Sequence, residues 1–244
     1  MTKSSSGPSC VGGIVVRQFE ALQTIAKMVE QGHGHFAVVL LRPAYEELVW
    51  VEYLDKIPNE ARELVPLLGL HEMTTNLNAQ NEFAGLDGMN TIGFTQRYVK
   101  VSLARDRIAQ RQIRELGACL GWRKNALRPS MEFLSRKVGR EKDYKFLYQA
   151  TSRFVHFSTA EIFRRAWGQK GKIEIHSKTF SNYWETFAIY WGFRIFLYLL
   201  IECNDLLEQI AYPKEKLEEL MKALSGFRQV PIITPEELGT WPQK

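Results

Sequence analysis

Two sets of polar side chains have the residue types and the spacing that acid–base chemistry requires. Arg42 and Glu46 are four residues apart in an apolar segment, so on a helix they share one face and can form an ion pair. Tyr148, Ser152 and His156 repeat at the same four-residue step and would form one ridge of a second helix. Histidine exchanges a proton near neutral pH, which makes His156 the candidate acid or base. We take these five residues as the candidate catalytic residues.

Both sets also have a structural interpretation. The Arg42–Glu46 pair can fix the register of its helix at the edge of the core. His156 can be a histidine at the edge of the core whose ring forms a hydrogen bond with a neighbouring side chain. An open cleft that gathers Arg42, Glu46 and His156 would favour chemistry. Burial of all three without a cavity would favour the structural interpretation.

Helices are the elements that would position these side chains. Apolar residues recur at steps of three and four along most of the chain, which is typical of amphipathic helices. One segment differs, because nine of the nineteen residues from Phe180 to Tyr198 are aromatic and cover nearly all faces, which indicates a buried helix. The predicted long helices are 14–31, 35–56, 94–118, 141–167 and 178–211, and the shorter ones are 58–69, 129–138 and 213–224. Pro43 lies inside the second of these and predicts a kink or a short break near Val39.

The predicted fold is all-α, a single-domain bundle of seven or eight helices around the long aromatic-rich helix. Residues 1–10 are expected to be a disordered tail, 11–225 the helical bundle domain, and 226–244 an extended C-terminal strap. Residues 72–93 are polar and rich in Asn, Thr and Gly, which predicts a long loop. Residues 172–176 alternate like a small strand that has no evident partner.

Positive charge is concentrated in the middle of the chain. The net charge is +5, but residues 97–172 contain 19 basic and six acidic side chains, so the remainder is acidic. On helices the basic residues would form two stripes, which predict non-specific binding of nucleic acid or of an acidic protein surface. We also expect a homo-oligomer, in which acidic ends contact basic middles. The stripe residues are Arg97, Lys100, Arg107, Arg111 and Arg114 on one helix, and Lys142, Arg153 and Arg164 on another.

Several classes of site are missing from the sequence. It has no glycine-rich nucleotide loop, no second histidine to complete a zinc pair with His71, and no nucleophilic serine elbow. Its three cysteines are scattered, and its first ten residues lack the apolar stretch of a secretion signal. We therefore expect no cofactor, no metal site and a cytoplasmic location. We expect no membrane contact, because Glu185 and Arg194 interrupt the apolar run of the aromatic helix.

The arrangement of Arg42-Pro43-x-x-Glu46 with a later Tyr148-x-x-x-Ser152-x-x-x-His156 resembles a loose family of uncharacterised prokaryotic all-helical proteins. The resemblance covers about residues 15–210. That family is distantly similar to the HEPN superfamily of helical bundles, which includes ribonucleases of toxin and phage-defence systems. The HEPN ribonuclease motif places four to six residues between an arginine and a histidine, whereas only two residues separate Arg153 from His156.

These observations leave three hypotheses for the function. The first is a non-catalytic helical component of a prokaryotic defence or stress system, which binds nucleic acid through its basic surface. The second is a HEPN-like enzyme that acts on nucleic acid, using His156 with Arg42 and Glu46. The third is a helical bundle that binds a small ligand in the same polar cluster.

Overall fold

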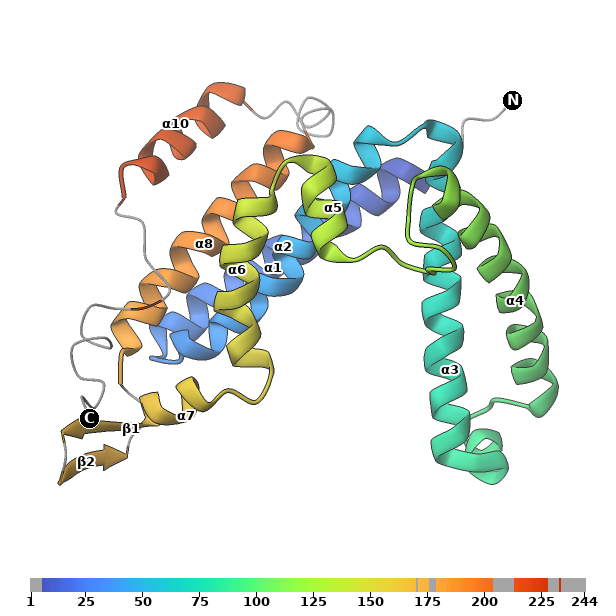
Figure 1. Ribbon diagram of the computed structural model, residues 1–244, viewed down its shortest axis with the longest axis horizontal. Coiled ribbons are helices and arrows are strands. Elements are labelled where there is room, and N and C mark those ends of the chain that lie inside the picture. The colour runs from blue at the N-terminus through green and yellow to red at the C-terminus, as the bar shows by residue number, and fades with distance from the viewer. Residues whose placement is uncertain (1–5, 170, 176–178, 204–212, 228–232, 234–244) are drawn as a thin grey trace. The chain divides into compact units, whose positions relative to one another are not determined.

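The computed structural model describes residues 6–169, 171–175, 179–203, 213–227 and 233 (Figure 1). Most of these residues are helical, which confirms the predicted all-α fold. Contacts within the bundle group the chain into two compact units. The first consists of Met1–Tyr53 with Ser135–Lys244, and the second of Leu54–Leu134.

Four long helices form the framework of the first unit. α1 lies along α8, and α1 also contacts α2, since the Gln18 side-chain amide donates to the Ala44 carbonyl at 2.8 Å. α6 packs on α8 through aromatic pairs such as Phe154 and Trp184, whose ring centroids are 4.8 Å apart. The four helices are α1 (Ser6–Glu30), α2 (Gly34–Lys56), α6 (Glu141–Val155) and α8 (Ser181–Glu202).

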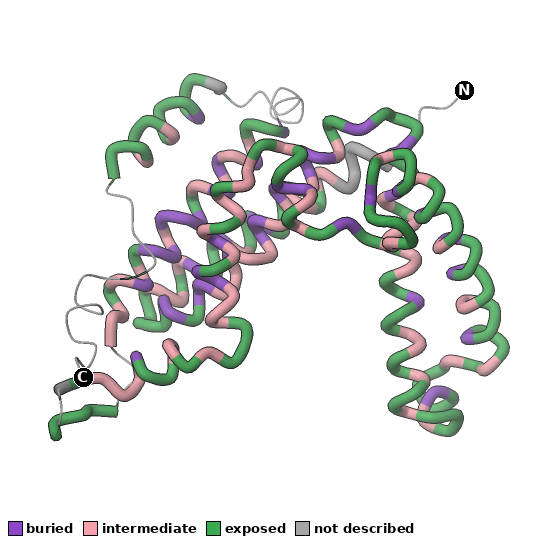
Figure 2. The backbone as a smooth tube through the Cα atoms, viewed as in Figure 1, coloured by how far each residue is buried: buried purple, intermediate pink, exposed green. Residues whose placement is uncertain are grey.

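The aromatic helix α8 carries much of the core of this unit, as its composition predicts. Trp184 and Phe187 are almost fully buried, and buried residues recur along α8 in Figure 2. α2 begins close against it, because a Cβ atom on Gly34 would lie only 2.2 Å from Cγ of Glu185. Among the described residues, α8 is long and apolar enough to cross a membrane. Half of its most apolar stretch is buried inside the protein, as is common for a core helix.

Shorter elements complete the first unit. α5 (Met131–Val138) precedes α6, α7 (Thr159–Arg165) follows it, and α10 (Lys214–Ser225) packs on α8. The strand predicted at residues 172–176 is present as β2 (Lys172–Ile175). It pairs in antiparallel register with β1 (Ala166–Gln169), so the expectation that this strand has no partner is wrong. The partner is the segment directly before it, whose strand character the sequence pattern did not reveal.

The second unit is a helical hairpin. It begins with the short 3-10 helix η1 (Asn59–Glu63), and α3 (Leu64–Thr91) and α4 (Gln96–Cys119) then pack against each other. Thr95 caps α4, because its hydroxyl accepts a hydrogen bond from the backbone N–H of Tyr98 at 3.3 Å. α4 buries Val99, Ala109 and Ile113 along one face.

Helix α3 replaces the long loop predicted for residues 72–93, and that prediction is wrong. The hydroxyls of Thr74 and Thr75 each donate at 2.9 Å to the carbonyl four residues earlier, so these polar residues are accommodated within the helix. The glycine-rich composition marks a break instead. Gly85 has φ 66° and ψ −176°, a conformation that favours glycine and divides α3 into two helical pieces.

Three other boundaries differ from the sequence predictions. Residues 6–10 belong to α1, so they are not part of a disordered tail. The single helix predicted over 141–167 is two helices, because the chain is extended after Val155. α2 continues through Pro43, where a kink or break was expected near Val39. Most of the predicted strap over 226–244 lies outside the described residues, as does the end of the helix predicted to reach residue 211.

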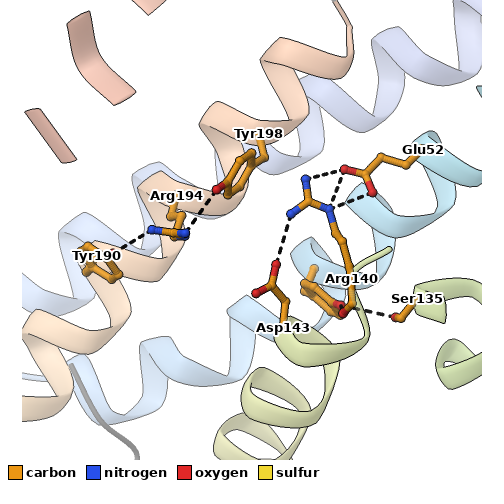
Figure 3. A network of polar contacts seen from close by, with 8 residues as sticks. Glu52, Ser135, Arg140, Asp143, Tyr190, Arg194 and Tyr198 are labelled. Carbon is orange, nitrogen blue, oxygen red and sulfur yellow. Dashed lines mark hydrogen bonds and ion pairs between the residues drawn. The ribbon is translucent and has the colours of Figure 1, made fainter. Parts of the chain in front are cut away.

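A buried ion pair connects α2 to the start of α6 (Figure 3). The two oxygens of Glu52 accept hydrogen bonds from Nε of Arg140 at 2.6 and 2.8 Å, and their side chains are only 6% and 14% exposed. Asp143 accepts from the same guanidinium at 3.2 Å, and Arg140 also lies over the ring of Tyr198 on α8. Burial alone would lower the pKa of Arg140, but the Glu52 and Asp143 carboxylates raise it, so the guanidinium stays charged.

A buried histidine lies at the start of α2. His35 is 6% exposed, and neither of its ring nitrogens has a hydrogen-bond partner among the described residues. Burial, followed by the charges of Arg165 and His33, lowers its pKa from 6.5 to about 4. The folded protein therefore keeps His35 neutral at pH values at which the unfolded chain would protonate it.

We predict that removing one member of the Glu52–Arg140 pair destabilises the protein strongly. Arg140→Ala should lower the free energy of unfolding by about 3–5 kcal/mol, because Glu52 stays buried without its partner. The double variant Arg140→Met/Glu52→Leu should recover most of that loss. Lys145→Ala is the matched control, because its pair with Glu141 is exposed and should contribute little to stability. Urea denaturation measures all four proteins, and equal losses for the two single variants would contradict the prediction.

We also predict that His35 makes stability depend on pH. Between pH 6.5 and about 4 the unfolded chain binds more protons than the folded protein, so stability should fall as the pH is lowered through this window. The melting temperature of His35→Leu should fall less than that of the wild type over the same range. His33→Leu is the control: His33 is exposed and its charge is the smallest of the three causes that lower the pKa of His35, so this variant should stay close to the wild type. Parallel curves for the wild type and His35→Leu would show that another group is responsible.

Candidate functional site

Arg42, on α2, brings four of the five candidate catalytic residues together. Its Nε donates to Oε1 of Glu46 at 3.2 Å, which confirms the predicted ion pair. Its Nη2 donates to the Tyr148 hydroxyl at 3.1 Å, and its Nη1 lies 3.3 Å from Nε2 of His156. The guanidinium carbon also lies 4.5 Å from the centre of the Tyr148 ring. Arg42, Glu46, Tyr148 and His156 are termed the arginine cluster below.

The end of α6 determines where His156 lies. His156 follows the last helical residue and has an extended backbone, with φ −113° and ψ 165°. Ser158 then begins α7 as its N-cap. The prediction that His156 continues a helical ridge with Ser152 is therefore wrong. Ser152 contributes a backbone carbonyl, which accepts the N–H of His156 at 3.0 Å. Within the described part of the chain, its hydroxyl makes no hydrogen bond to the arginine cluster.

The hydrogen-bonding groups define the protonation form of the histidine in this arrangement. A guanidinium group only donates, so Nε2 of His156 must accept, and the neutral ring then carries its proton on Nδ1. The three contacts use three of the five N–H groups of Arg42. As far as the described residues show, one N–H on each terminal nitrogen has no protein partner and could donate to an incoming oxygen anion. A phosphate bound there would lie beside an unprotonated imidazole nitrogen.

The residue after His156 is an exposed aromatic side chain, which is not among the candidate residues predicted from the sequence. Phe157 follows His156 directly and is 85% exposed. Its place between two helices makes it part of a short exposed connection, and it fills no position in the core. Exposed aromatic rings beside phosphate-binding groups are a feature of surfaces that bind single-stranded nucleic acid.

The first predicted basic stripe is exposed on the second unit. Its five residues lie along α4 and all are exposed, as a nucleic-acid surface requires: Arg97, Lys100, Arg107, Arg111 and Arg114. The second predicted stripe lies on the first unit, where Lys142 is exposed and Arg153 is partly exposed on α6.

Arg164 does not belong to an exposed basic surface, so its prediction is wrong. It is 4% exposed, forms an ion pair with Glu161, and lies with its guanidinium carbon 4.6 Å from the centre of the Trp184 ring. The prediction assumed one straight helix from 141 to 167. Because α7 is a separate helix, the face on which Arg164 lies cannot be extrapolated from α6.

Sequence reasoning missed the partly buried polar contacts around α8. Arg194 donates to the hydroxyls of Tyr190 at 2.9 Å and Tyr198 at 3.2 Å, both on its own helix (Figure 3). Their four-residue spacing is readable in the sequence. The Glu52–Arg140 pair, in contrast, joins residues 88 positions apart and has no local signal.

A histidine–aspartate pair links the two helices of the second unit. Nδ1 of His71 lies 2.9 Å from Oδ1 of Asp106, whose other oxygen accepts from Gln110 at 2.6 Å. These contacts connect α3 to α4. Within the part of the chain that the structure describes, no group of three or more His, Cys, Asp or Glu side chains is placed to hold a metal ion.

A search of the curated proteins finds no match, and neither does a search of the solved structures. A family model matches residues 9–173, which is more than half of the chain. The matched region contains every residue of the arginine cluster and the whole of the second unit. The family has no known function, in keeping with the resemblance to uncharacterised proteins. On this match, the chain belongs to DUF5677, a family of unknown function.

Proposed function

We propose that this protein cleaves single-stranded RNA, with the arginine cluster as its active site. The single observation that carries the proposal is the 3.3 Å approach of the Arg42 guanidinium to Nε2 of the exposed His156. This contact places a cation that can bind a phosphate beside a nitrogen that can accept a proton. Both groups are needed to move a proton and to stabilise negative charge on phosphate oxygens.

The reaction would be a transesterification within the RNA backbone. When the substrate binds, Nη1 of Arg42 would turn from His156 to a phosphate oxygen, which frees the lone pair of Nε2. Nε2 of His156 then takes the proton of a 2′-hydroxyl while the 2′-oxygen attacks the adjacent phosphorus atom. The bond from phosphorus to the 5′-oxygen breaks, which leaves a 2′,3′-cyclic phosphate, and His156 returns its proton to the departing 5′-oxygen. Arg42 would stabilise the negative charge on the non-bridging oxygens. Glu46 and Tyr148 would hold the guanidinium in place.

Phe157 supports the choice of a single strand. Phe157 follows His156 directly in the chain and its side chain is exposed, so an unpaired base of a bound strand could stack on its ring. Such stacking contributes about 1–3 kcal/mol per base and needs bases that are not in a duplex. The requirement for a 2′-hydroxyl selects RNA over DNA.

The family that this chain resembles is distantly similar to the HEPN superfamily, although the chain lacks the arginine–histidine spacing of HEPN ribonucleases. In their motif an arginine and a histidine lie a few residues apart in the chain. Here Arg42 and His156 are 114 positions apart and approach each other from α2 and the end of α6. We propose that the arginine cluster is a HEPN-like pair assembled from two segments.

A second candidate function is favoured by the exposed charge on α4. Lys100, Arg107, Arg111 and Arg114 fall within a sector of about 60° on this helix. They support a non-catalytic role, in which the protein binds nucleic acid without cleaving it. As such a component of a prokaryotic defence or stress system, it would be cytoplasmic and oligomeric.

The nuclease proposal predicts cleavage that depends on His156. The purified protein should cleave a fluorescently labelled single-stranded RNA and leave the DNA of the same sequence intact, with products that end in a cyclic phosphate. His156→Ala should slow cleavage by about 10²–10⁴-fold, the usual contribution of a general acid–base group. EDTA should not inhibit it, because no step uses a metal ion. Denaturing gels and mass spectrometry of the products provide the measurement.

His33→Ala is the matched control for this experiment, because His33 is an exposed histidine outside the arginine cluster. It should cleave RNA at the wild-type rate. Phe157→Ala should raise KM more than it lowers kcat, since stacking holds the substrate. Cleavage that survives in His156→Ala, or a wild type inert on every RNA tested, would refute the proposal.

The second candidate predicts binding that weakens steeply with salt. If four side chains of α4 each neutralise one phosphate, log K for single-stranded RNA should fall against log salt with a slope of about −3. Arg107→Glu/Arg111→Glu should weaken binding and make the slope shallower by about 1.4. Lys216→Glu/Lys222→Glu on α10 changes the net charge equally and should leave the slope unchanged. Fluorescence anisotropy at several salt concentrations measures the slope. Identical slopes for the two double variants would show that α4 is not the RNA-binding surface.

A further inference from the structure

The second unit has an open groove between its two helices that the proposed RNA chemistry does not use. The groove has a volume of about 760 Å³. Met73 on its α3 side is 66% exposed, and Tyr98 on its α4 side is 55% exposed. Exposed apolar surface of this kind on a folded protein usually marks a binding site. The apolar residues that line it are Leu70, Met73, Leu77, Phe94, Tyr98 and Val101.

The spacing of these residues fits the packing of a further helix. On α3, Leu70, Met73 and Leu77 are separated by three and four residues, and on α4, Tyr98 and Val101 are separated by three. Phe94 lies just before α4. Steps of three and four are the repeat that packs helix against helix. The α4 residues of this stripe differ from those that α4 buries, such as Val99 and Ile113. Both helices of the hairpin therefore contribute apolar residues to the groove that the second unit leaves unburied.

The burial along α3 supports the same conclusion. Only three of its 28 residues are buried, namely Leu64, Thr74 and Met89. Tertiary packing usually supplies most of the stability of a helix in a protein. A helix laid in the groove would cover Leu70, Met73 and Leu77 and remove their apolar surface from water.

The charge of the groove identifies the occupant. Arg97 and Arg105 also line it from α4, and of the described residues that line it none is acidic. The two arginines are eight residues apart, which is about 12 Å along a helix. We propose that the groove binds an acidic amphipathic helix of another protein. The apolar face of that helix would pack on the apolar residues of the groove, and its carboxylates would pair with Arg97 and Arg105.

Two other occupants fit less well. A second copy of the same hairpin would bring its own Arg97 and Arg105 into a symmetric interface, so positive charge would face positive charge. A nucleic acid would place phosphates against an apolar floor of Leu70, Leu77 and Val101, which cannot hydrogen-bond to them.

Two synthetic peptides test the proposal on the full-length protein. Each has 21 residues with leucine at heptad positions a and d; one has glutamate at e and g, and the other has lysine there. Like charges at e and g keep each peptide monomeric. Fluorescence anisotropy at 150 mM salt should show that the glutamate peptide binds at least tenfold more tightly than the lysine peptide.

The arginines are tested by charge reversal. Arg97→Glu/Arg105→Glu should invert the preference, so that the lysine peptide binds more tightly, and this gain of binding also shows that the variant is folded. Lys100→Glu/Arg107→Glu is the matched control, because it changes the charge equally on the outward side of α4. It should keep the preference for the glutamate peptide.

Several results would overturn the proposal. One is equal affinity for both peptides, or no binding of either. Another is a wild type that sediments as a dimer and dissociates in Val101→Glu, which would make a second copy the occupant. A third is displacement of the glutamate peptide by single-stranded RNA together with loss of RNA binding in Arg97→Glu/Arg105→Glu.

Discussion

The buried ion pair between Glu52 and Arg140 sets the helix register on which the arginine cluster depends. α2 and α6 are antiparallel in their contacts, since Glu52 near the end of α2 meets the residue that precedes α6, and Arg42 meets Tyr148 further along. Along α2, ten residues or about 15 Å separate positions 42 and 52, and along α6 eight residues or about 12 Å separate 140 and 148. A shift of one helical turn, about 5.4 Å, would separate Arg42 from Tyr148. The same shift would leave Glu52 buried and unpaired, so the cost of breaking the ion pair also protects the cluster.

Two arginines of this unit serve different purposes because their surroundings differ. Arg140 is largely buried and bound by the carboxylates of Glu52 and Asp143, so its charge is neutralised within the fold. Arg42 has one carboxylate partner, Glu46, and two neutral ones, and it lies nearer to solvent. It therefore retains positive charge and unused N–H groups. The proposed phosphate site requires such incomplete pairing.

The sequence alone predicts the features that depend on local spacing. The Arg42–Glu46 pair and the aromatic core helix are both visible as helical periodicity. His156 was identified as a candidate, but its contact with Arg42 depends on the end of α6, which no breaker residue marks. Residues 72–93 were misassigned for a related reason. A helix with one neighbour in its hairpin leaves most of its surface to solvent, so its composition is as polar as that of a loop.

The number of basic residues in a segment overestimates the charge of its surface, because some of them form ion pairs with carboxylates of the same protein. Of the basic residues in the middle of the chain, Arg140, Lys145 and Arg164 pair with carboxylates of the first unit. The exposed residues of α4 include few acids, and the one buried acid there, Asp106, is bound to His71 and Gln110. The positive charge available to a partner is therefore concentrated on α4. Arg97 and Arg105 border an apolar groove, whereas Lys100 and Arg107 face outward. The same helix therefore has two positively charged surfaces, one beside apolar side chains and one surrounded by water. An acidic helix can bury apolar surface on the first, and a phosphate backbone can stay hydrated on the second.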